Sequence, residues 1–545
     1  MNGAQAIAEI LRREGTEFLS CYPRNPLIEA CAEIGIRPIL CRQERVGVGL
    51  ADGYSRIHRG RRNGVFAAQA GPGIENAFPG IAQAYSENVP MLILPAGQAL
   101  ARQYRHPTFD ASEVYAPVTK WSARAHAAAE LPETMRRAFQ AMRTGKGGPV
   151  LVEVPAEVWE EALPGELDYE PVVPQRAAPD PAALQKAAEM LANAESPVLW
   201  AGQGVLYAGA SDALVRLAEL VPAPVVATNP GKSAMPENHP LACGSSTRSG
   251  PKMLFEFLRR ADLVLAVGSS LTRTPFGPAI PPGKTIVHST NDPDDIHKDY
   301  RADHALVGDA KLVLDGLIER VGALRRANGG ARSLAEVTGA VAEVKADWRA
   351  EWAAERDSDE VPINQYRIIR DLMATVERDN VIITHDSGSP REQLLPMWET
   401  TAPDSYIGWG KSTQLGYSLA VIMGAKLAAP GKLCINVMGD AAIGMTGMDL
   451  ETAARDRIAI LTIVLNNGIM AAERDVLVVS DEKYGAMTVG GNYTKVAEGL
   501  GVQAARVEAP DDFIPALEKG IAVTEAGAPF LIECIVKEGQ SFSRY

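Results

Sequence analysis

Short apolar runs alternate with amphipathic helical patterns along most of the chain. In the first third, stretches whose apolar residues recur at helical spacing separate these runs. The runs cover residues 17–21, 38–41, 64–68, 91–95 and 147–155. Strands that alternate with helices pair in parallel and carry the helices on both faces of the sheet. The first third therefore predicts a doubly wound parallel sheet.

The same alternation recurs twice further along the chain. Runs that predict strands cover residues 197–201, 224–227, 263–267 and 285–288, and then 380–384, 432–439, 458–466 and 529–536. Residues 164–181, rich in Pro and acidic side chains, predict a linker, and 324–359, charged and Ala-rich, predict an exposed helical connector. The fold class is therefore α/β, with three doubly wound parallel-sheet domains. We place them at residues 1–165, 183–322 and 360–545, which suits a chain of 545 residues.

Two neighbouring strands of the third domain end in polar residues. Asp440 follows the run 432–439, and Asn467 follows the run 458–466, with helix-like sequence between the two runs. The carboxyl ends of adjacent parallel strands are where open α/β sheets bind ligands, so these side chains are expected to converge. Mg²⁺ takes hard oxygen ligands, and the glycine at position 468 lets the main-chain carbonyl of Ile469 face the same ion. The alternative is an ordinary aspartate at a strand end and an ordinary Asn-Asn-Gly turn.

This pattern resembles the diphosphate-binding motif of thiamine diphosphate-dependent enzymes, G-D-G followed by a helix, a strand and N-N. The resemblance implies thiamine diphosphate and Mg²⁺ as cofactors, with Asp440, Asn467 and the carbonyl of Ile469 as metal ligands. Ala441 replaces the usual third glycine, as Ser or Ala does in the oxalyl-CoA decarboxylase branch, and binding through a backbone N–H tolerates the change. The further residues expected along the diphosphate are Gly439, Ala441, Ala442 and Met470.

The resemblance also requires a glutamate for the cofactor's aminopyrimidine ring, supplied by the other cofactor-binding domain. Residues 41–56 resemble the family's stretch of an acid, small residues and A-D-G-Y-A-R, and Glu44 is the matching acid. In the family this glutamate lies in an apolar cleft with a raised pKa and shares its proton with the ring. The alternative is a surface glutamate at a helix start, stabilised by the helix dipole.

Other stretches extend the resemblance. Residues 69–76 and 89–98 resemble the acetolactate synthase patterns S-G-P-G-A-T-N and I-P-M…G-Q, which nominates Pro72, Asn76 and Gln98. Residues 386–389 resemble the loop beside the diphosphate and substrate, which nominates Ser387, Gly388 and Ser389. Leu415 stands where the family wedges the cofactor into its bent form, and plain core packing is an equal alternative for it.

The resemblance implies cleavage or formation of a C–C bond in a 2-oxo acid or related carbonyl compound. Gln69 stands about where benzoylformate decarboxylase-like relatives carry a catalytic His, and the paired histidines of pyruvate decarboxylases are absent. We therefore predict an acetolactate synthase-like carboligase, with Gln69 as a catalytic candidate. Gln98, His106, Phe109 and His385 are the candidate substrate contacts. The alternatives are a 2-oxo acid or oxalyl-CoA-like decarboxylase, a 1,2-diketone lyase, and a nucleotide-binding α/β protein without thiamine chemistry.

The middle domain gives weaker signals. Residues 201–205 form one Gly-rich turn after a strand, but residues 269–275 lack the R-F-D-D-R-like stretch of flavin-binding relatives. An empty or structural domain is therefore favoured over one that binds FAD or ADP. Because relatives build the active site from two domains that meet across a two-fold axis, we predict a homodimer or homotetramer with active sites at the subunit interface.

Composition narrows the class of protein. Hydrophobic residues make up 46% and charged residues 22%, and no apolar run is long enough to span a bilayer. The net charge of −13 comes without a basic stripe, so neither nucleic acid nor a membrane is expected as a partner. Six cysteines without a C-x-x-C pair, and an N-terminus without a signal-peptide pattern, predict reduced thiols in the cytoplasm.

Overall fold

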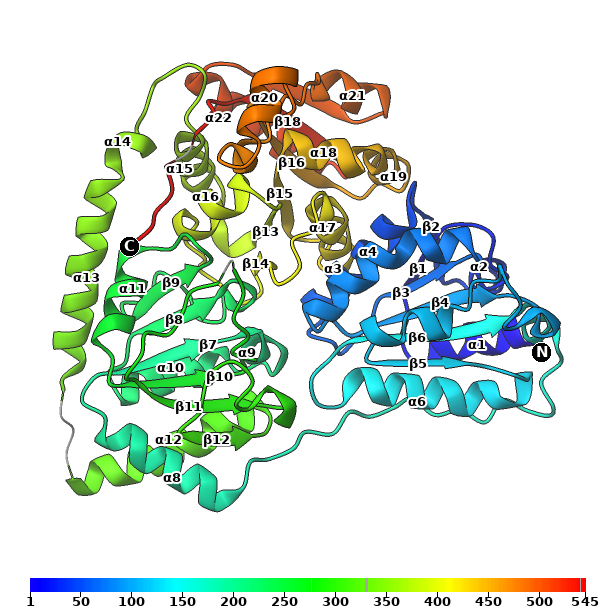
Figure 1. The fold of residues 1–545 in the computed structure, drawn as a ribbon, viewed down its shortest axis with the longest axis horizontal. Coiled ribbons are helices and arrows are strands. Elements are labelled where there is room, and N and C mark those ends of the chain that lie inside the picture. The colour runs from blue at the N-terminus through cyan, green and yellow to red at the C-terminus, as the bar shows by residue number, and fades with distance from the viewer. Residues whose placement is uncertain (276, 329–331, 540) are drawn as a thin grey trace.

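Three parallel β-sheets form the framework of the chain (Figure 1). The structure is a computed structural model that describes residues 1–275, 277–328, 332–539 and 541–545. Each sheet has six strands, every strand pairing in it is parallel, and helices flank the sheets, which confirms the predicted α/β class with doubly wound sheets. Within these ranges no helix has the length and apolarity required to cross a membrane.

The N-terminal sheet has the strand order β2-β1-β3-β4-β6-β5. Its strands are β1 (Phe18–Cys21), β2 (Arg37–Leu40), β3 (Val65–Ala68), β4 (Met91–Gly97), β5 (Trp121–Arg124) and β6 (Pro149–Pro155). Its helices are α1 (Gly3–Arg13), α2 (Leu27–Glu33), α3 (Glu44–Ile57), α4 (Pro72–Ser86), α5 (Ala111–Val114), α6 (Leu131–Arg143) and α7 (Ala156–Glu160).

The C-terminal sheet has the order β14-β13-β15-β16-β18-β17, which is the N-terminal order repeated strand for strand. Its strands are β13 (Val381–His385), β14 (Tyr406–Ile407), β15 (Leu433–Gly439), β16 (Ile460–Asn466), β17 (Gln503–Val507) and β18 (Phe530–Ile535). Its helices are α15 (Gln365–Thr375), α16 (Ser389–Met397), α17 (Tyr417–Ala428), α18 (Asp440–Thr446), α19 (Leu450–Arg455), α20 (Val478–Tyr484), α21 (Tyr493–Gly499) and α22 (Phe513–Glu525).

The central sheet differs from the other two, with the order β12-β11-β10-β7-β8-β9. Counted from β7, this is the order of the Rossmann fold, which reverses direction between β7 and β10. Its strands are β7 (Pro197–Ala201), β8 (Val225–Thr228), β9 (Ala242–Ser246), β10 (Leu263–Val267), β11 (Thr285–Thr290) and β12 (His304–Val307). Its helices are α8 (Pro181–Asn193), α9 (Gln203–Tyr207), α10 (Ser211–Leu220), α11 (Lys252–Arg260) and α12 (Ala310–Asn328).

Two segments connect the three sheets. Between α7 and α8 every residue is described and none belongs to a helix or strand, in keeping with the predicted linker. The second connector contains α13 (Leu334–Glu351) and α14 (Ala353–Arg356). The expectation that this connector is exposed is wrong for one face of α13. That face buries Val337, Val341, Val344 and Trp348, because these residues recur at helical spacing and pack on the central and C-terminal cores.

The N-terminal and C-terminal units touch through α3 and α17. These helices occupy equivalent positions in the two sheets, each between the second and third strands of its unit. They approach so closely that a Cβ added at Gly53 would lie 2.0 Å from the carbonyl oxygen of Val421, and one added at Gly424 would lie 2.0 Å from that of Leu50. The two helices therefore pack against each other backbone to backbone.

Candidate active site

The carboxyl ends of β15 and β16 bring Asp440 beside the Asn-Asn-Gly turn. The two strands pair in parallel with Gly439 opposite Leu465, so the residues that follow them leave the sheet side by side. Asp440 is 3% exposed and accepts hydrogen bonds from the backbone N–H groups of Ala441 and Gly468, each at 2.7 Å. Burial raises the pKa of Asp440, and these hydrogen bonds to the ionised form oppose that rise.

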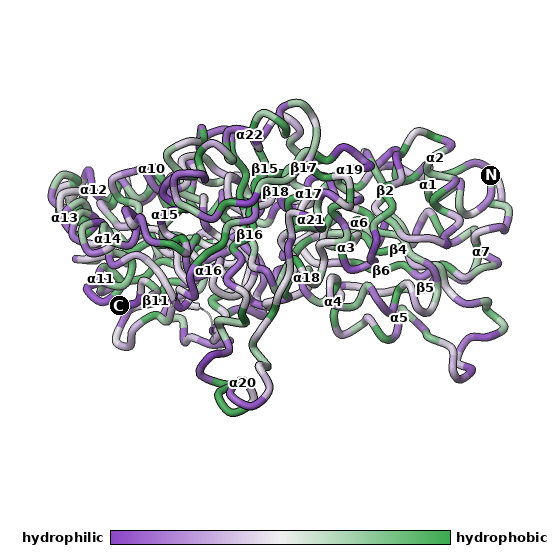
Figure 2. The backbone as a smooth tube through the Cα atoms, turned by 90° about the horizontal axis from the view of Figure 1, so that it is seen from above, coloured by the Kyte–Doolittle hydropathy of each residue, from purple (hydrophilic) through white to green (hydrophobic). Residues whose placement is uncertain are grey.

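Short-range hydrogen bonds hold the Asn-Asn-Gly turn, and the carbonyl of Ile469 accepts the N–H of Ala471 at 3.0 Å. Gly468 has φ +73°, a left-handed conformation that glycine adopts at little cost. The side-chain oxygen of Asn467 accepts the N–H of Ile469 at 3.2 Å, and Ile469 then pairs with Thr488 across the base of an excursion of the chain. Figure 2 shows α20, at the tip of this excursion, projecting from the body of the molecule.

The surroundings of Asp440 leave room for a ligand. A Cβ added at Gly388 or Gly444 would meet no atom within 4 Å, and one added at Gly439 would meet only the Cγ of Pro390 at 3.8 Å. Packing therefore does not require glycine at these positions. A carboxylate, an amide oxygen and a main-chain carbonyl are the kinds of ligand that suit Mg²⁺, which prefers oxygen and keeps several sites for phosphate and water. The residues present fit a magnesium diphosphate group.

Glu44 lies at the first turn of α3 and is buried, with 6% of its surface exposed. Glu44 is therefore not the surface glutamate that was the alternative prediction from the sequence. Its carboxylate accepts a hydrogen bond from the side-chain amide of Asn76 on α4, and a Cβ added at Gly73 would lie 3.5 Å from its Oε1. The close approach of α4 encloses the glutamate.

The start of α4 gathers more of the predicted residues. Pro72 is the first residue of the helix, and Gln98 comes near this turn, because a Cβ added at Gly71 would lie 3.9 Å from its Nε2. The side-chain oxygen of Gln69 faces the backbone N–H of Arg24 at 3.4 Å. Gln69, Pro72, Asn76 and Gln98 thus lie on one side of the N-terminal sheet, together with Glu44.

The Glu44 region and the Asp440 region are joined within one chain. The guanidinium of Arg45 donates to the main-chain carbonyl of Leu415 at 2.6 Å, and the side chain of Gln43 donates to that of Met445 at 3.3 Å. Leu415 is partly buried against the core shared by the two units. Neither contact is predictable from the sequence, because Gln43 and Arg45 carry no motif of their own.

Asp386 organises the loop beside this region. It is fully buried and accepts the N–H groups of Ser387 at 2.8 Å and Gly416 at 2.9 Å, while its other oxygen accepts the N–H of Ser418 at 3.1 Å. Burial raises its pKa, and hydrogen bonds from Ser418 and the backbone oppose the rise. Asp386 thereby ties the predicted segment Ser387, Gly388 and Ser389 to the start of α17.

The other predicted substrate residues differ in their burial. His385 is completely buried, stacks on Trp409 with ring centroids 5.1 Å apart and faces Asn229 of the central domain at 3.3 Å. Burial holds the pKa of His385 well below its ordinary value. His106 is exposed in a surface loop. Phe109 packs edge-on against Tyr115, with the ring centroids 6.4 Å apart. The structure gives His385 no surface toward a substrate.

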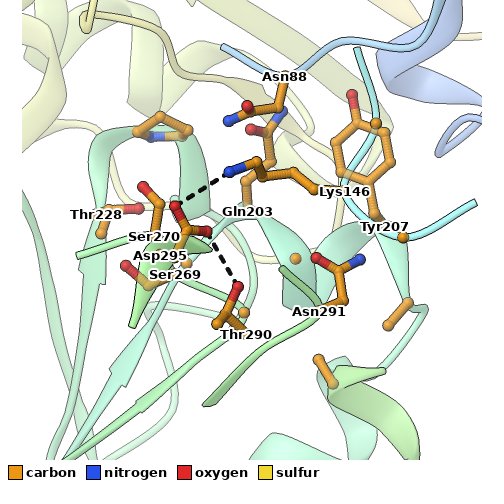
Figure 3. Close-up of a pocket in the computed structure, with 18 of the residues that line it drawn as sticks. Asn88, Lys146, Gln203, Tyr207, Thr228, Ser269, Ser270, Thr290, Asn291 and Asp295 are labelled. Carbon is orange, nitrogen blue, oxygen red and sulfur yellow. Dashed lines mark hydrogen bonds and ion pairs between the residues drawn. The ribbon is translucent and has the colours of Figure 1, made fainter. Parts of the chain in front are cut away.

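A separate cavity of about 720 Å³ lies at the carboxyl edge of the central sheet (Figure 3). Loops after β7, β8, β10, β11 and β12 line it, together with residues of the N-terminal unit. Lys146 reaches in from that unit and donates to Asp295 at 3.0 Å, and Thr290 donates to the same carboxylate at 3.1 Å (Figure 3). None of its lining residues was predicted from the thiamine diphosphate motifs.

Packing explains much of the Gly-rich turn in this cavity. A Cβ added at Gly202 would lie 2.3 Å from the carbonyl oxygen of Gly268, and one added at Gly204 would lie 2.7 Å from its Cα. The two turns, which follow β7 and β10 where the strand order reverses, therefore need glycine to touch each other. The glycines do not by themselves indicate a phosphate.

Three family models match successive parts of the chain. Residues 1–114 match the N-terminal TPP binding domain of thiamine pyrophosphate enzymes, residues 184–317 their central domain, and residues 386–534 their C-terminal TPP binding domain. The chain belongs to the thiamine pyrophosphate-dependent enzyme family.

Individual relatives span nearly the whole chain. It is 29% identical to a probable acetolactate synthase large subunit of Methanocaldococcus jannaschii, over 99% of this chain and 93% of the relative. It is 27% identical to a glyoxylate carboligase of Escherichia coli O157:H7, over 100% of this chain and 94% of the relative. It is also 30% identical to a probable 2-ketoarginine decarboxylase of Pseudomonas aeruginosa, over 87% of this chain and 84% of the relative.

Proposed function

We propose that this enzyme joins two carbonyl compounds in an acetolactate synthase-like carboligation, with a 2-oxo acid as the donor. The observation that carries the proposal is the buried Glu44 at the start of α3, whose neighbours Gln43 and Arg45 contact the unit that carries Asp440 and Asn467. Similarity over nearly the full length to a probable acetolactate synthase large subunit and to a glyoxylate carboligase supports the choice of carboligation. The relative named as a decarboxylase supports the alternative, simple decarboxylation.

In this proposal Asp440, Asn467 and the carbonyl of Ile469 hold Mg²⁺ and, through it, the diphosphate of thiamine diphosphate. When bound, this cofactor supplies a carbon nucleophile and an electron sink for the bond that is broken. Glu44 holds a proton at the aminopyrimidine ring, and its burial beside Asn76 keeps competing water away. Leu415 supports the ring in its bent form.

A screen with the magnesium-loaded enzyme decides between carboligation and simple decarboxylation. The enzyme is incubated with thiamine diphosphate and individual 2-oxo acids, with and without a second carbonyl acceptor, and CO₂ and ligated product are measured together. Carboligation predicts ligated product in proportion to CO₂. An aldehyde as the main product, at all acceptor concentrations, would instead assign a decarboxylase, and cleavage of a 1,2-diketone would assign a lyase.

Binding of the cofactor is tested separately from the reaction. Thiamine diphosphate with Mg²⁺ is expected to raise the melting temperature, since a ligand at 100 times its Kd stabilises a protein by about 2.7 kcal/mol. Thiamine diphosphate with EDTA is expected to give a smaller shift. A protein that melts at the same temperature with and without both would lack the proposed site.

For the central domain we propose a structural role without flavin. Two observations support this: the glycine contact between the turns after β7 and β10, and the Lys146–Asp295 ion pair inside the cavity. The volume of the cavity lies in the range of ligand pockets, which is the observation in favour of FAD or ADP. Denaturing the purified protein and analysing the released small molecules checks this. One flavin or adenine nucleotide per chain would overturn the structural role.

We also propose a homodimer or homotetramer in the cytoplasm, with the active sites at a subunit interface. All six cysteines are buried free thiols, as expected for a reducing compartment. The direct contact of α3 with α17 in one chain supports the alternative, a site completed within each subunit.

A further inference from the structure

Glu533 is a buried carboxylate beneath the Asn-Asn-Gly turn. It lies in β18, next to β16 in the sheet, opposite Val464, and its exposed fraction is 0%. The neighbouring residues Leu531, Ile532 and Cys534 are buried and apolar, so Glu533 is the exception in its strand. A carboxylate in such a strand is costly to bury unless several donors compensate its charge.

The donors to Glu533 come from both ends of the segment that carries the predicted metal ligands. At the start, the side-chain amide of Asn466 donates to Oε1 at 2.7 Å. At the end, the backbone N–H and the hydroxyl of Thr494 donate to Oε2 at 3.0 and 2.7 Å. Between these two residues the chain makes the whole excursion that includes α20. One carboxylate thus closes the base of this loop.

Asn466 connects Glu533 to the Asn-Asn-Gly turn that carries the predicted metal ligands. Its side-chain oxygen accepts the N–H of Gly468 at 3.1 Å, the same N–H that donates to Asp440 at 2.7 Å. The carbonyl of Gly468 in turn accepts the N–H of Val489 at 2.9 Å on the returning chain. With its amide held by Glu533, Asn466 can present only its oxygen to Gly468, which fixes the orientation of the turn.

The charge of Glu533 is maintained in this setting. Burial alone would raise its pKa, but hydrogen bonds from Thr494 and Asn466 outweigh burial and lower it. Arg506 forms an ion pair with Oε1 at 3.1 Å from the solvent side, and the Arg506 side chain is 35% exposed. The carboxylate is therefore available as an acceptor for both ends of the loop.

We propose that Glu533 is a positioning residue for the magnesium diphosphate site, acting through Asn466 to hold Asn467 and the carbonyl of Ile469 in place. This inference rests on the proposed function, because it assumes that the turn binds Mg²⁺ with thiamine diphosphate. Residues that orient metal ligands typically contribute about 10- to 100-fold to metal affinity. Glu533 touches no ligand of the metal directly.

The test compares Glu533→Gln with Arg506→Gln and the unchanged protein. Calorimetric titration of Mg²⁺ in the presence of thiamine diphosphate measures affinity, and hydrogen–deuterium exchange without either ligand measures the order of residues 466–470. Glu533→Gln is expected to weaken Mg²⁺ binding about 10- to 100-fold and to speed exchange at Gly468, because Gln cannot accept from both Asn466 and Thr494. Arg506→Gln removes the ion pairs with Glu533 and Glu508 but leaves the donors from Asn466 and Thr494, so it is expected to change affinity less than about threefold.

The outcomes separate the inference from the proposed function. If the unchanged protein binds no thiamine diphosphate with Mg²⁺, the proposed function fails. If it binds and Glu533→Gln has the same affinity and exchange, the positioning role is overturned and Glu533 is merely structural. If Glu533→Gln does not fold, Thr494→Val and Asn466→Ala replace it. Each is expected to weaken Mg²⁺ binding, and unchanged affinity in both would overturn the proposal.

Discussion

Asp449 illustrates how a single carboxylate responds to the contact between the two cofactor-facing units. It is fully buried, its Oδ1 accepts the backbone N–H of Arg42 at 2.6 Å, and its Oδ2 has no hydrogen-bond partner among the described residues. Burial raises its pKa from 3.8 to about 6. The bond to Arg42 fixes the chain two residues before Glu44.

This shift predicts a pH dependence of stability. Because the folded-state pKa of Asp449 lies above the unfolded value, its contribution is fully present below pH 3.8 and is lost as the pH rises through about 6. Asp449→Asn cannot ionise, so it is expected to gain stability relative to the unchanged protein over this window, by about 3 kcal/mol at most. Denaturant unfolding of both proteins between about pH 4 and 7 measures the difference. A constant difference across the range would contradict the assignment.

A second prediction at this scale concerns Glu44. Glu44→Gln is expected to retain binding of thiamine diphosphate and Mg²⁺, because the diphosphate is held by the other unit. Exchange of the C2 proton of the bound cofactor is expected to slow at least about 100-fold, since the variant has no carboxyl proton to share. Proton exchange followed by NMR measures this. Glu29→Gln, in the first turn of α2, is the control, and equal rates in both variants would remove Glu44 from its role.

At the scale of elements, the contact between α3 and α17 depends on small residues. Gly424→Ala would place a Cβ 2.0 Å from the carbonyl oxygen of Leu50, which is backbone and cannot rotate away. The helices must then separate, and a destabilisation of about 1–3 kcal/mol with weaker cofactor binding is expected. Denaturant unfolding and cofactor titration measure the two effects.

Gly339→Ala is the matched control, because Gly339 is an exposed glycine of α13 whose added Cβ would meet no atom within 4 Å. It is expected to stabilise the protein by up to about 1 kcal/mol, through helix propensity alone. Similar losses of stability in both variants would show that the α3–α17 contact tolerates a methyl group.

The sequence predicted inner strands far better than edge strands. The five strands that were not predicted are β5, β9, β12, β14 and β17, and each lies at an edge of its sheet. Inner strands are covered on both faces and read as apolar runs, whereas an edge strand such as β17 is mostly polar or half exposed. β14 has only two residues. Pairing with a neighbour, rather than local composition, makes these segments strands.

At the scale of the whole molecule, two units with the same strand order meet through equivalent helices. The N-terminal unit carries Glu44, the C-terminal unit carries Asp440, and the equivalent helices α3 and α17 pack against each other. Such an arrangement has an approximate two-fold relation between unlike domains. The N-terminal and C-terminal units that form one active site can belong to the same chain or to two copies of it.

Mixing two inactive variants distinguishes these cases. Glu44→Gln and Asp440→Ala damage opposite halves of the site, and the two proteins are unfolded and refolded together in equal amounts. Sites between subunits predict recovery of about a quarter of full activity, because half of the dimers are mixed and each has one intact site of two. Sites within one chain predict no recovery. Sedimentation of the mixture confirms that mixed oligomers were able to form.

The sequence by itself determined the α/β class, the three sheets and the family, because these depend on local patterns. Apolar runs at strand spacing, and an aspartate and an asparagine that end successive strands, carry this information without any long-range contact. Tertiary structure decided the rest. It buried His385 between two domains, brought Gln43 and Arg45 to Met445 and Leu415, and placed Glu533 under the Asn-Asn-Gly turn. These relations join residues far apart in the chain, so no local pattern predicts them, although a lone glutamate in an apolar strand was a signal available in the sequence.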